Sequence, residues 1–178
     1  MKYKGEIGLL ELQKSAFLCS QKCPAEIVLK SFDWAKEQRE KGNCIVCGNH
    51  SQIEKDVFKI LLKGKQPLIL VLARGMKTRW EPEIEKAVNE RRLLVISPFE
   101  KENKRVTRET AEIRNKKIIK MSDKIIVGYK SKNGQLEKLL KRIEHEQLSP
   151  ARKPYTFCNS HEPTLSPKIA KEYVLPTP

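Results

Sequence analysis

The sequence predicts an α/β domain with a mostly parallel, five-stranded sheet and helices on both faces. Five short apolar runs are each followed by a segment with helical spacing of its apolar residues. The runs do not alternate with polar residues, which is typical of strands buried on both faces. Strands separated by helices of this length form right-handed parallel crossovers, so the pattern indicates a Rossmann-like fold.

The first two units occupy the first third of the chain. The run SAFLCS, residues 15 to 20, precedes a helical pattern that ends at Gly42, in the position expected of a C-terminal glycine. The run in NCIVCGNH, with Cys44 to Val46 as its apolar part, precedes IEKDVFKILLKG, whose apolar residues also recur at helical intervals. Each unit reads as a strand, a loop and a helix.

Three further units follow. PLILVLARG predicts a third strand, and the helix EPEIEKAVNERR after it tolerates Pro82 in its first turn. LLVISPF predicts the fourth strand, before the helix KRVTRETAEIRNKKIIKM. DKIIVGY predicts the fifth strand, and NGQLEKLLKRIEHE a closing helix. These units complete the sheet.

The composition changes near the C-terminus, where the last 31 residues hold six of the ten prolines and no sustained periodicity. We therefore divide the chain into a Rossmann-like domain, residues 1 to 146, and an extended or disordered, proline-rich tail, residues 147 to 178. One domain plus a tail suits a chain of 178 residues. An alternative for the tail is a peptide laid along the domain through Tyr155, Phe157 and Tyr173.

The chain is strongly basic, with 36 Lys and Arg against 22 Asp and Glu, a net charge of +14 and a pI near 9.6. Such a charge concentrates polyanions around a protein, so nucleic acid is the first partner to consider. The plainer alternative is that the charge only adds solubility. The mixed first residues and the odd count of five cysteines favour a cytoplasmic protein. No apolar run approaches the ~20 residues that span a bilayer, so we expect no membrane association.

Small, polar and basic residues follow the apolar runs, where an open parallel sheet binds its ligands. Glycine permits close approach of a phosphate, Ser and Asn donate hydrogen bonds, and Lys or Arg supplies charge. The alternative is that these loops need the same residues as turns and caps. The candidates in these loops for contact with phosphate are Ser20, Lys22, Gly48, Asn49, His50, Ser51, Arg74, Gly75 and Gly134.

The sequence does not predict a cofactor or a metal. It contains no complete GxGxxG or GxxxxGKS pattern, so a standard dinucleotide or P-loop site is not supported. Cys44 and Cys47 have the spacing of a zinc motif, but on a strand they point to opposite faces. His50 and Glu54 lie four residues apart, which suits either a general-base pair or a histidine that only caps a helix.

The stretch RNKKIIKMSDKIIVGY places Arg114 and Asn115 on or beside the packing face of a helix. In one interpretation Asn115 only ties down neighbouring loop carbonyls, because a buried amide needs partners. In the functional interpretation both residues lie beside the ligand crevice, with Arg114 as an anion clamp and Asn115 fixing the loop geometry. Basic residues outnumber acidic ones along this helix, which makes it a candidate electrostatic footprint.

Taken in order, FLCSQK, VCGNH, LILVLARG, LLVISPF and RNKKIIKMSDKIIVGY with NGQL resemble the Rossmann-like domain of the DprA/Smf DNA-processing family. The wider superfamily includes the lysine-decarboxylase-like LOG proteins. RNKKII with SDKIIVGY is the most specific match to the family's RNRIIA motif and last strand. The resemblance spans roughly residues 15 to 140. The first two loops depart from the family pattern, because they lack its arginines.

The resemblance implies a stand-alone core that binds nucleic-acid phosphates or a nucleotide and associates as a homodimer. In DprA proper it also implies binding of single-stranded DNA and a recombinase partner, RecA. Our first hypothesis is therefore a protein of DNA processing or recombination that binds single-stranded DNA without catalysis. The rival hypothesis is a LOG-like enzyme that hydrolyses the N-glycosidic bond of a nucleoside monophosphate, or a small-nucleotide sensor. For the enzyme, Gly134 and Glu137 only partly match the LOG motif.

Overall fold

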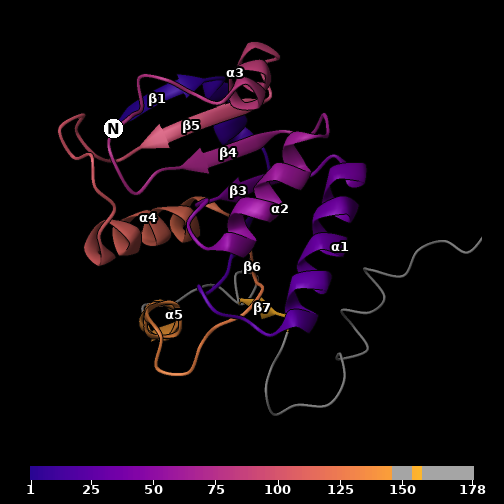
Figure 1. Cartoon of the computed structure of the whole chain (residues 1–178), viewed down its shortest axis with the longest axis vertical. Coiled ribbons are helices and arrows are strands. Elements are labelled where there is room, and N and C mark those ends of the chain that lie inside the picture. Colours follow the sequence, from indigo (N-terminus) through magenta and orange to yellow (C-terminus); the bar gives the residue numbers. More distant parts are fainter. Residues whose placement is uncertain (146–153, 158–178) are drawn as a thin grey trace, which may run out of the picture.

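The computed structural model describes residues 1–145 and 154–157, and in this part seven strands form one sheet. Their order is β1-β5-β4-β3-β2-β6-β7 (Figure 1). The strands are β1 (Lys2–Gly5), β2 (Lys14–Leu18), β3 (Cys44–Cys47), β4 (Leu68–Val71), β5 (Leu93–Ser97), β6 (Lys124–Val127) and β7 (Tyr155–Thr156). The helices are the 3-10 helix η1 (Ile7–Glu11) and α1 (Ala25–Lys41), α2 (Gln52–Leu62), α3 (Pro82–Asn89), α4 (Arg108–Met121) and α5 (Gln135–His145).

The five expected strands form the parallel centre of the sheet, and the α/β, Rossmann-like class is confirmed. The expected number of strands is wrong, because a strand is added at each edge. β1 pairs antiparallel with β5, and β7 pairs parallel with β6. β1 reads KYKG and is largely exposed, so it lacks the continuous apolar run that marks a buried strand. Gly5 ends β1 with φ of 106° against the backbone of Leu93, where any side chain would collide.

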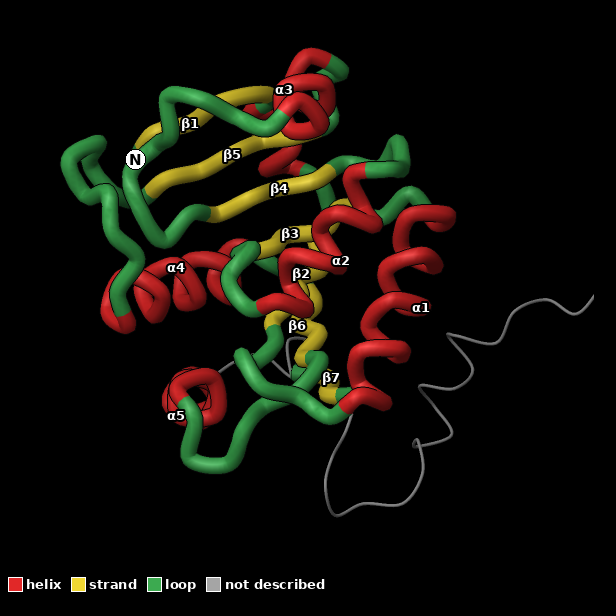
Figure 2. The backbone as a smooth tube through the Cα atoms, in the orientation of Figure 1, coloured by secondary structure: helices red, strands yellow, loops and turns green. Residues whose placement is uncertain are grey.

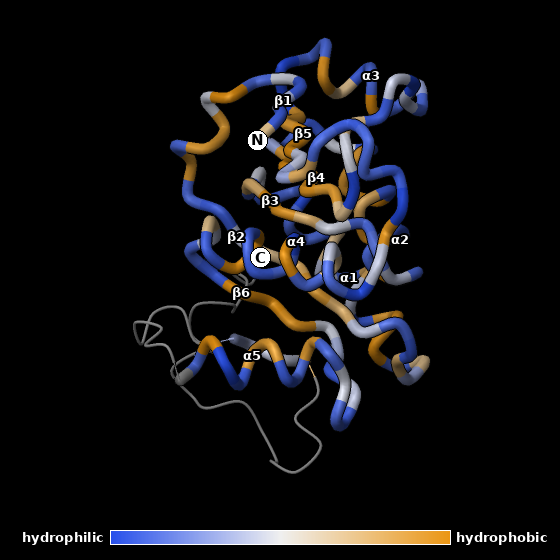
Figure 3. The backbone as a smooth tube through the Cα atoms, turned by 90° about the vertical axis from the view of Figure 1, so that its left-hand side faces the viewer, coloured by the Kyte–Doolittle hydropathy of each residue, from blue (hydrophilic) through white to orange (hydrophobic). Residues whose placement is uncertain are grey.

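Two helical layers cover the sheet (Figure 2). α1, α2 and α3 pack on one face through a cluster that includes Trp34, Phe58 and Ile84. η1, α4 and α5 pack on the other face around Leu9, Ile118 and Leu139. Hydrophobic residues mark the strands, and α5 alternates between apolar and polar residues (Figure 3). Both faces of the central strands are therefore buried, as the sequence predicts.

Local signals set the ends of the helices. Gly42 caps α1 in the left-handed conformation, with φ of 71°. Ser51 caps α2 by accepting a hydrogen bond from the Glu54 N–H. α4 begins only at Arg108, because Thr107 and Thr110 form a reciprocal capping box. All three signals can be found in the sequence.

The part of the C-terminal segment that the structure describes adds to the sheet. The N–H of Phe157 donates to the carbonyl of Val127, and its ring lies 6.4 Å from that of Phe17 and 6.3 Å from that of Trp34. Tyr155 and Phe157 therefore contact the domain, as the laid-along alternative expects of them. Tyr173 and most of the proposed tail lie outside the described residues.

The cysteines of the described part of the chain are free and largely buried. Cys44 and Cys47 pack into opposite faces of the sheet, as expected from their positions on a strand. Burial raises the pKa of the Cys44 thiol to about 11, and it raises the pKa of Cys47 further. Within residues 1–145 and 154–157 no helix is long and apolar enough to cross a membrane.

Candidate functional site

A crevice of about 310 Å³ opens at the carboxyl edge of the sheet, beside the N-terminal half of α4. The loops after β2, β3 and β6 and the N-terminal part of α5 form its other walls. Its polar lining includes three amides, which can both donate and accept hydrogen bonds. The polar residues that line the crevice are Ser20, Gln21, Lys22, His50, Glu54, Glu112, Arg114, Asn115, Ser131 and Gln135.

Arg114 is the largest buried side chain of the domain, with only 1% of its surface exposed. Its Nη1 donates to the carbonyl of Gly48 at 2.8 Å, and its Nε and Nη2 donate to Oδ1 of Asn115 at 3.1 and 2.8 Å. This differs from the expected anion clamp, because the guanidinium faces a loop carbonyl and an amide instead of solvent. The expected roles are exchanged: Arg114 fixes the loop, and Asn115 orients Arg114.

The guanidinium of Arg114 also explains why a glycine, Gly48, follows β3. A Cβ atom at Gly48 would lie 2.7 Å from Cζ of Arg114. The close approach that this glycine permits is therefore that of a guanidinium of the same chain, not of a phosphate. Gly75 is similar, because a Cβ there would lie 2.3 Å from the carbonyl oxygen of Glu100.

Glu54 is a second buried charge, with 2% of its surface exposed. Its carboxylate accepts hydrogen bonds from the N–H of Cys19 at 3.1 Å and from the N–H of His50 at 2.8 Å. It ties the loops after β2 and β3 together, and its charge partly compensates that of Arg114. Of the two alternatives for His50 and Glu54, these hydrogen bonds do not support a general-base pair, because the carboxylate binds the backbone and not the imidazole.

His50 lies at the mouth of the crevice, in the loop before α2. Its Nε2 is 3.1 Å from Nε2 of Gln21, so the two side chains share one hydrogen bond across the crevice. Burial and the nearby charge of Arg114 lower the pKa of His50. The imidazole is therefore neutral near pH 7 and is able to accept as well as donate.

Two of the predicted serines already accept hydrogen bonds within the protein. Oγ of Ser20 accepts from the N–H of Ser131, and Ser51 is the buried cap of α2. The N–H of Asn133 donates to the Glu137 carboxylate at 2.7 Å, so this glutamate caps the loop before α5. Lys22, in contrast, is exposed, and no ion pair involves it within the described residues.

A larger groove of about 900 Å³ lies between α2 and α3 and reaches the same edge of the sheet. His50 and Arg114 line both hollows, so the groove and the crevice adjoin. The floor of the groove is apolar, and Leu70 and Leu72 of the sheet contribute to it. The rim is basic.

The structure sorts the eleven predicted residues into three groups. The crevice is lined by Ser20, Lys22, His50, Arg114, Asn115 and Gly134. The groove is lined by Gly48, Asn49 and Arg74, together with His50 and Arg114. Ser51 and Gly75 line neither hollow.

Sequence reasoning missed two sets of lining residues. Gln21 and Gln135 line the crevice, but an isolated glutamine carries no pattern. The groove is lined by Lys55, Lys59, Lys63 and Trp80, and its lysines do carry a signal. They recur every four residues along α2 and at its C-cap, Lys63, opposite the apolar stripe of the helix.

Comparisons with known proteins agree with the fold of the domain. No protein-family model and no curated protein matches the chain. Two solved structures match 86% of it: DNA processing protein A (DprA) of Streptococcus pneumoniae, at 20% identity and a TM-score of 0.67, and DprA of Helicobacter pylori, at 16% and 0.66. The chain spans 53% of the first protein and 69% of the second, which is described as binding single-stranded DNA. The domain therefore has the fold of DprA proteins, as the resemblance implied.

Proposed function

We propose that this protein binds single-stranded DNA, without catalysis, through the crevice at the carboxyl edge of its sheet. The observation that carries the proposal is the crevice itself, a hollow of about 310 Å³ lined by amides, a neutral histidine and a lysine. The described binding of single-stranded DNA by the H. pylori protein of the same fold supports it.

The chemistry of the lining suits one nucleobase and its phosphate. The amide of Gln135, the amide nitrogen of Asn115 and the amide oxygen of Gln21 are groups of the kind that pair with base edges. The other amide atoms of Asn115 and Gln21 already bind Arg114 and His50. Lys22 supplies an exposed cation on the loop after β2. Arg114 and Glu54 contribute indirectly, because they hold the loops that carry these groups.

A titration of a fluorescent oligothymidylate tests the proposal. We expect anisotropy to rise on binding and affinity to fall steeply with salt, by a slope of about 0.7 per neutralised phosphate. The variant Gln21→Ala/Lys22→Gln removes two exposed groups of the crevice and should weaken binding roughly tenfold. Lys36→Gln is the charge-matched control, since Lys36 lies on α1 and pairs with Asp33.

Two outcomes would contradict the proposal. One is equal binding by the crevice variant and the wild type. The other is thermal stabilisation by a mononucleotide with no affinity for the oligonucleotide, which favours the nucleotide-binding enzyme or sensor. A LOG-like hydrolysis would then release free base from a nucleoside monophosphate.

Three further proposals follow from the resemblance, namely homodimerisation, cooperation with a recombinase in DNA recombination, and a cytoplasmic location. Light scattering coupled to size-exclusion chromatography measures the mass of the particle against the 20.6 kDa of one chain. Capture of purified RecA by the immobilised protein tests the second proposal. Cell fractionation tests the third.

A further inference from the structure

We propose that the groove between α2 and α3 is a second, extended binding surface for a single-stranded polynucleotide. Its phosphates would lie along α2 and its bases would point toward α3. The proposal rests on the proposed function for the class of ligand, but it concerns different residues. Four observations carry it: a row of unpaired lysines, an aromatic platform, two unpartnered guanidinium nitrogens and the asymmetry of the two walls.

The α2 wall carries a regular row of cations. Lys55, Lys59 and Lys63 are exposed and line the groove at every fourth residue. Four helical residues rise by about 6 Å, which is comparable to the separation of consecutive phosphates in an extended strand. The whole of α2 is about 16 Å long, enough for roughly three nucleotides.

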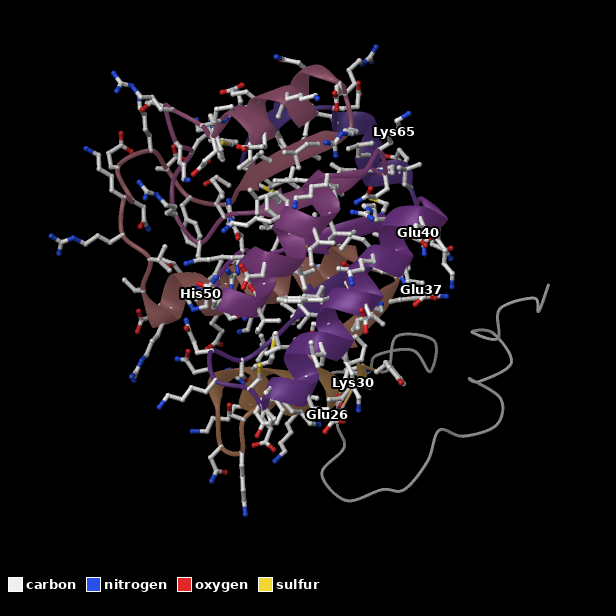
Figure 4. All side chains as sticks on the ribbon, turned by 45° about the vertical axis from the view of Figure 1, so that its right-hand side comes forward. Glu26, Lys30, Glu37, Glu40, His50 and Lys65 are labelled. Atoms are coloured by element: carbon white, nitrogen blue, oxygen red, sulfur yellow. The ribbon has the colours of Figure 1, made fainter. Side chains whose placement is uncertain are left out.

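No ion pair involves these three lysines within the described part of the chain, whereas several lysines on other helices are paired with carboxylates. On the neighbouring α1, Lys30 and Lys36 pair with Glu26 and Asp33. Figure 4 shows Glu26, Lys30, Glu37 and Glu40 along the outer side of α1, and His50 and Lys65 at opposite ends of α2. A row of cations without carboxylates favours an external polyanion.

Two arginines at the groove have buried nitrogens with no hydrogen-bond partner among the described residues. They are Nε of Arg74 and Nη1 of Arg92. Both residues line the groove, Arg74 after β4 and Arg92 before β5, so they lie toward its two ends. An unsatisfied buried donor is costly, so a movement of either side chain that brings this nitrogen to a phosphate or base oxygen in the groove would be favourable.

The α3 wall is different in character. Lys77 pairs with Glu81, and Glu90 pairs with Lys86 and Arg92, so most of its charges cancel. Trp80 is only partly buried on this side, with the Lys77 ammonium 5.4 Å from the centre of its ring. An indole that lines a groove is a platform on which a base can stack.

The asymmetry favours a polynucleotide over an acidic amphipathic peptide. A single strand has one anionic side, its backbone, and one neutral side, its bases, whose N–H groups can donate to carboxylates such as Glu83. An acidic helix would bring its carboxylates against Glu81 and Glu83 as well as against the lysines. The basic wall therefore matches the phosphates of a strand, the aromatic residue matches the faces of its bases, and the mixed wall matches the polar edges of the bases.

The experiment compares three variants of the full chain for binding of a fluorescent twelve-residue oligothymidylate. The groove variant is Lys55→Gln/Lys59→Gln/Lys63→Gln, and the crevice variant is Gln21→Ala/Lys22→Gln. The control is Lys2→Gln/Lys36→Gln/Lys141→Gln, which removes the same charge from lysines that are paired with carboxylates. All substituted lysines are exposed, so circular dichroism and melting temperature should be unchanged in each variant.

We expect the groove variant to bind roughly 10- to 100-fold more weakly at 50 mM salt, with a salt slope lower by about 2, and the control to lose far less. Groove and control variants with equal affinity would overturn the groove proposal, whatever the crevice variant does. A loss only in the groove variant would support the groove and contradict the proposed role of the crevice. The two proposals therefore fail separately.

Intrinsic fluorescence gives an independent measurement. Of the two tryptophans, Trp34 is 8% exposed in the core and stacked on Phe17, so a bound base can reach only Trp80. We expect the oligonucleotide to quench the emission of the wild type but not that of Trp80→Phe. A labelled peptide of glutamate and leucine that competes with the oligonucleotide, and binds more tightly than it through the same lysines, would identify the groove as a peptide site and overturn the proposal.

Discussion

The crevice and the groove differ in how their charges are used. At the crevice, Arg114 and Glu54 are almost completely buried and hold the loops after β2 and β3 through backbone hydrogen bonds. Along the groove, the lysines of α2 are exposed and have no carboxylate partner in the described part of the chain. The charges that look most like a functional motif in the sequence maintain the fold, whereas a row of lysines outside that motif is free to bind a ligand.

Replacement of Arg114 should produce the largest effect. In Arg114→Met the carbonyl of Gly48 loses its donor, and the buried Glu54 carboxylate loses the charge that compensates it. We expect the free energy of unfolding in urea to fall by about 3–5 kcal/mol. Arg142→Met is the control, because Arg142 is exposed and its pair with Glu112 is worth at most about 1 kcal/mol. Equal stability of the two variants would show that the buried guanidinium is not structural.

A methyl group on Gly48 should have the next largest effect. Gly48→Ala places a Cβ 2.7 Å from Cζ of Arg114, so the guanidinium must move and its hydrogen bonds must weaken. We expect a loss of about 1–3 kcal/mol in urea unfolding. Gly8→Ala is the control, since its Cβ would meet only a flexible carboxylate at 3.3 Å.

The double variant sharpens this comparison. When Arg114→Met is already present, the space beside Gly48 is less constrained. Gly48→Ala should then lower the free energy of unfolding by less than it does in the wild type. Additive losses would mean that the glycine is required for a reason other than the guanidinium.

These contacts show what the sequence can reveal. The apolar runs, the helical spacing and signals such as Gly42 and Pro82 predict the central sheet and its helices, because they depend on local geometry and burial. β1 escapes prediction because pairing with β5 requires little apolar surface at an edge. The partners of Arg114 also escape, since Gly48 is 66 residues away and only the folded sheet brings the two together.

Titration of His50 should change the stability of the protein less than Arg114→Met or Gly48→Ala does. Burial, and then the charge of Arg114, hold its pKa in the folded protein below the ordinary value of 6.5. As the pH falls from 7.5 through 6.5, the unfolded chain binds the proton first, so this histidine lowers stability over that window. Urea midpoints at pH 7.5 and 5.5 should therefore differ less in His50→Gln than in the wild type. A steeper dependence in the variant would contradict the lowered pKa.

Replacement of a single lysine of the groove should have the smallest effect on stability and yet change binding. Lys59 is exposed and unpaired within the described residues, so we expect Lys59→Gln to change the free energy of unfolding by no more than about 0.5 kcal/mol. Removal of one phosphate contact should lower the salt slope for a single-stranded oligonucleotide by about 0.7. Lys36→Gln, on α1, should change neither quantity measurably, because Lys36 is paired with Asp33. A variant whose stability equals that of the wild type, but whose oligonucleotide binding depends less on salt, separates binding charge from structural charge. Arg114→Met should show the reverse, namely lower stability with an unchanged salt slope.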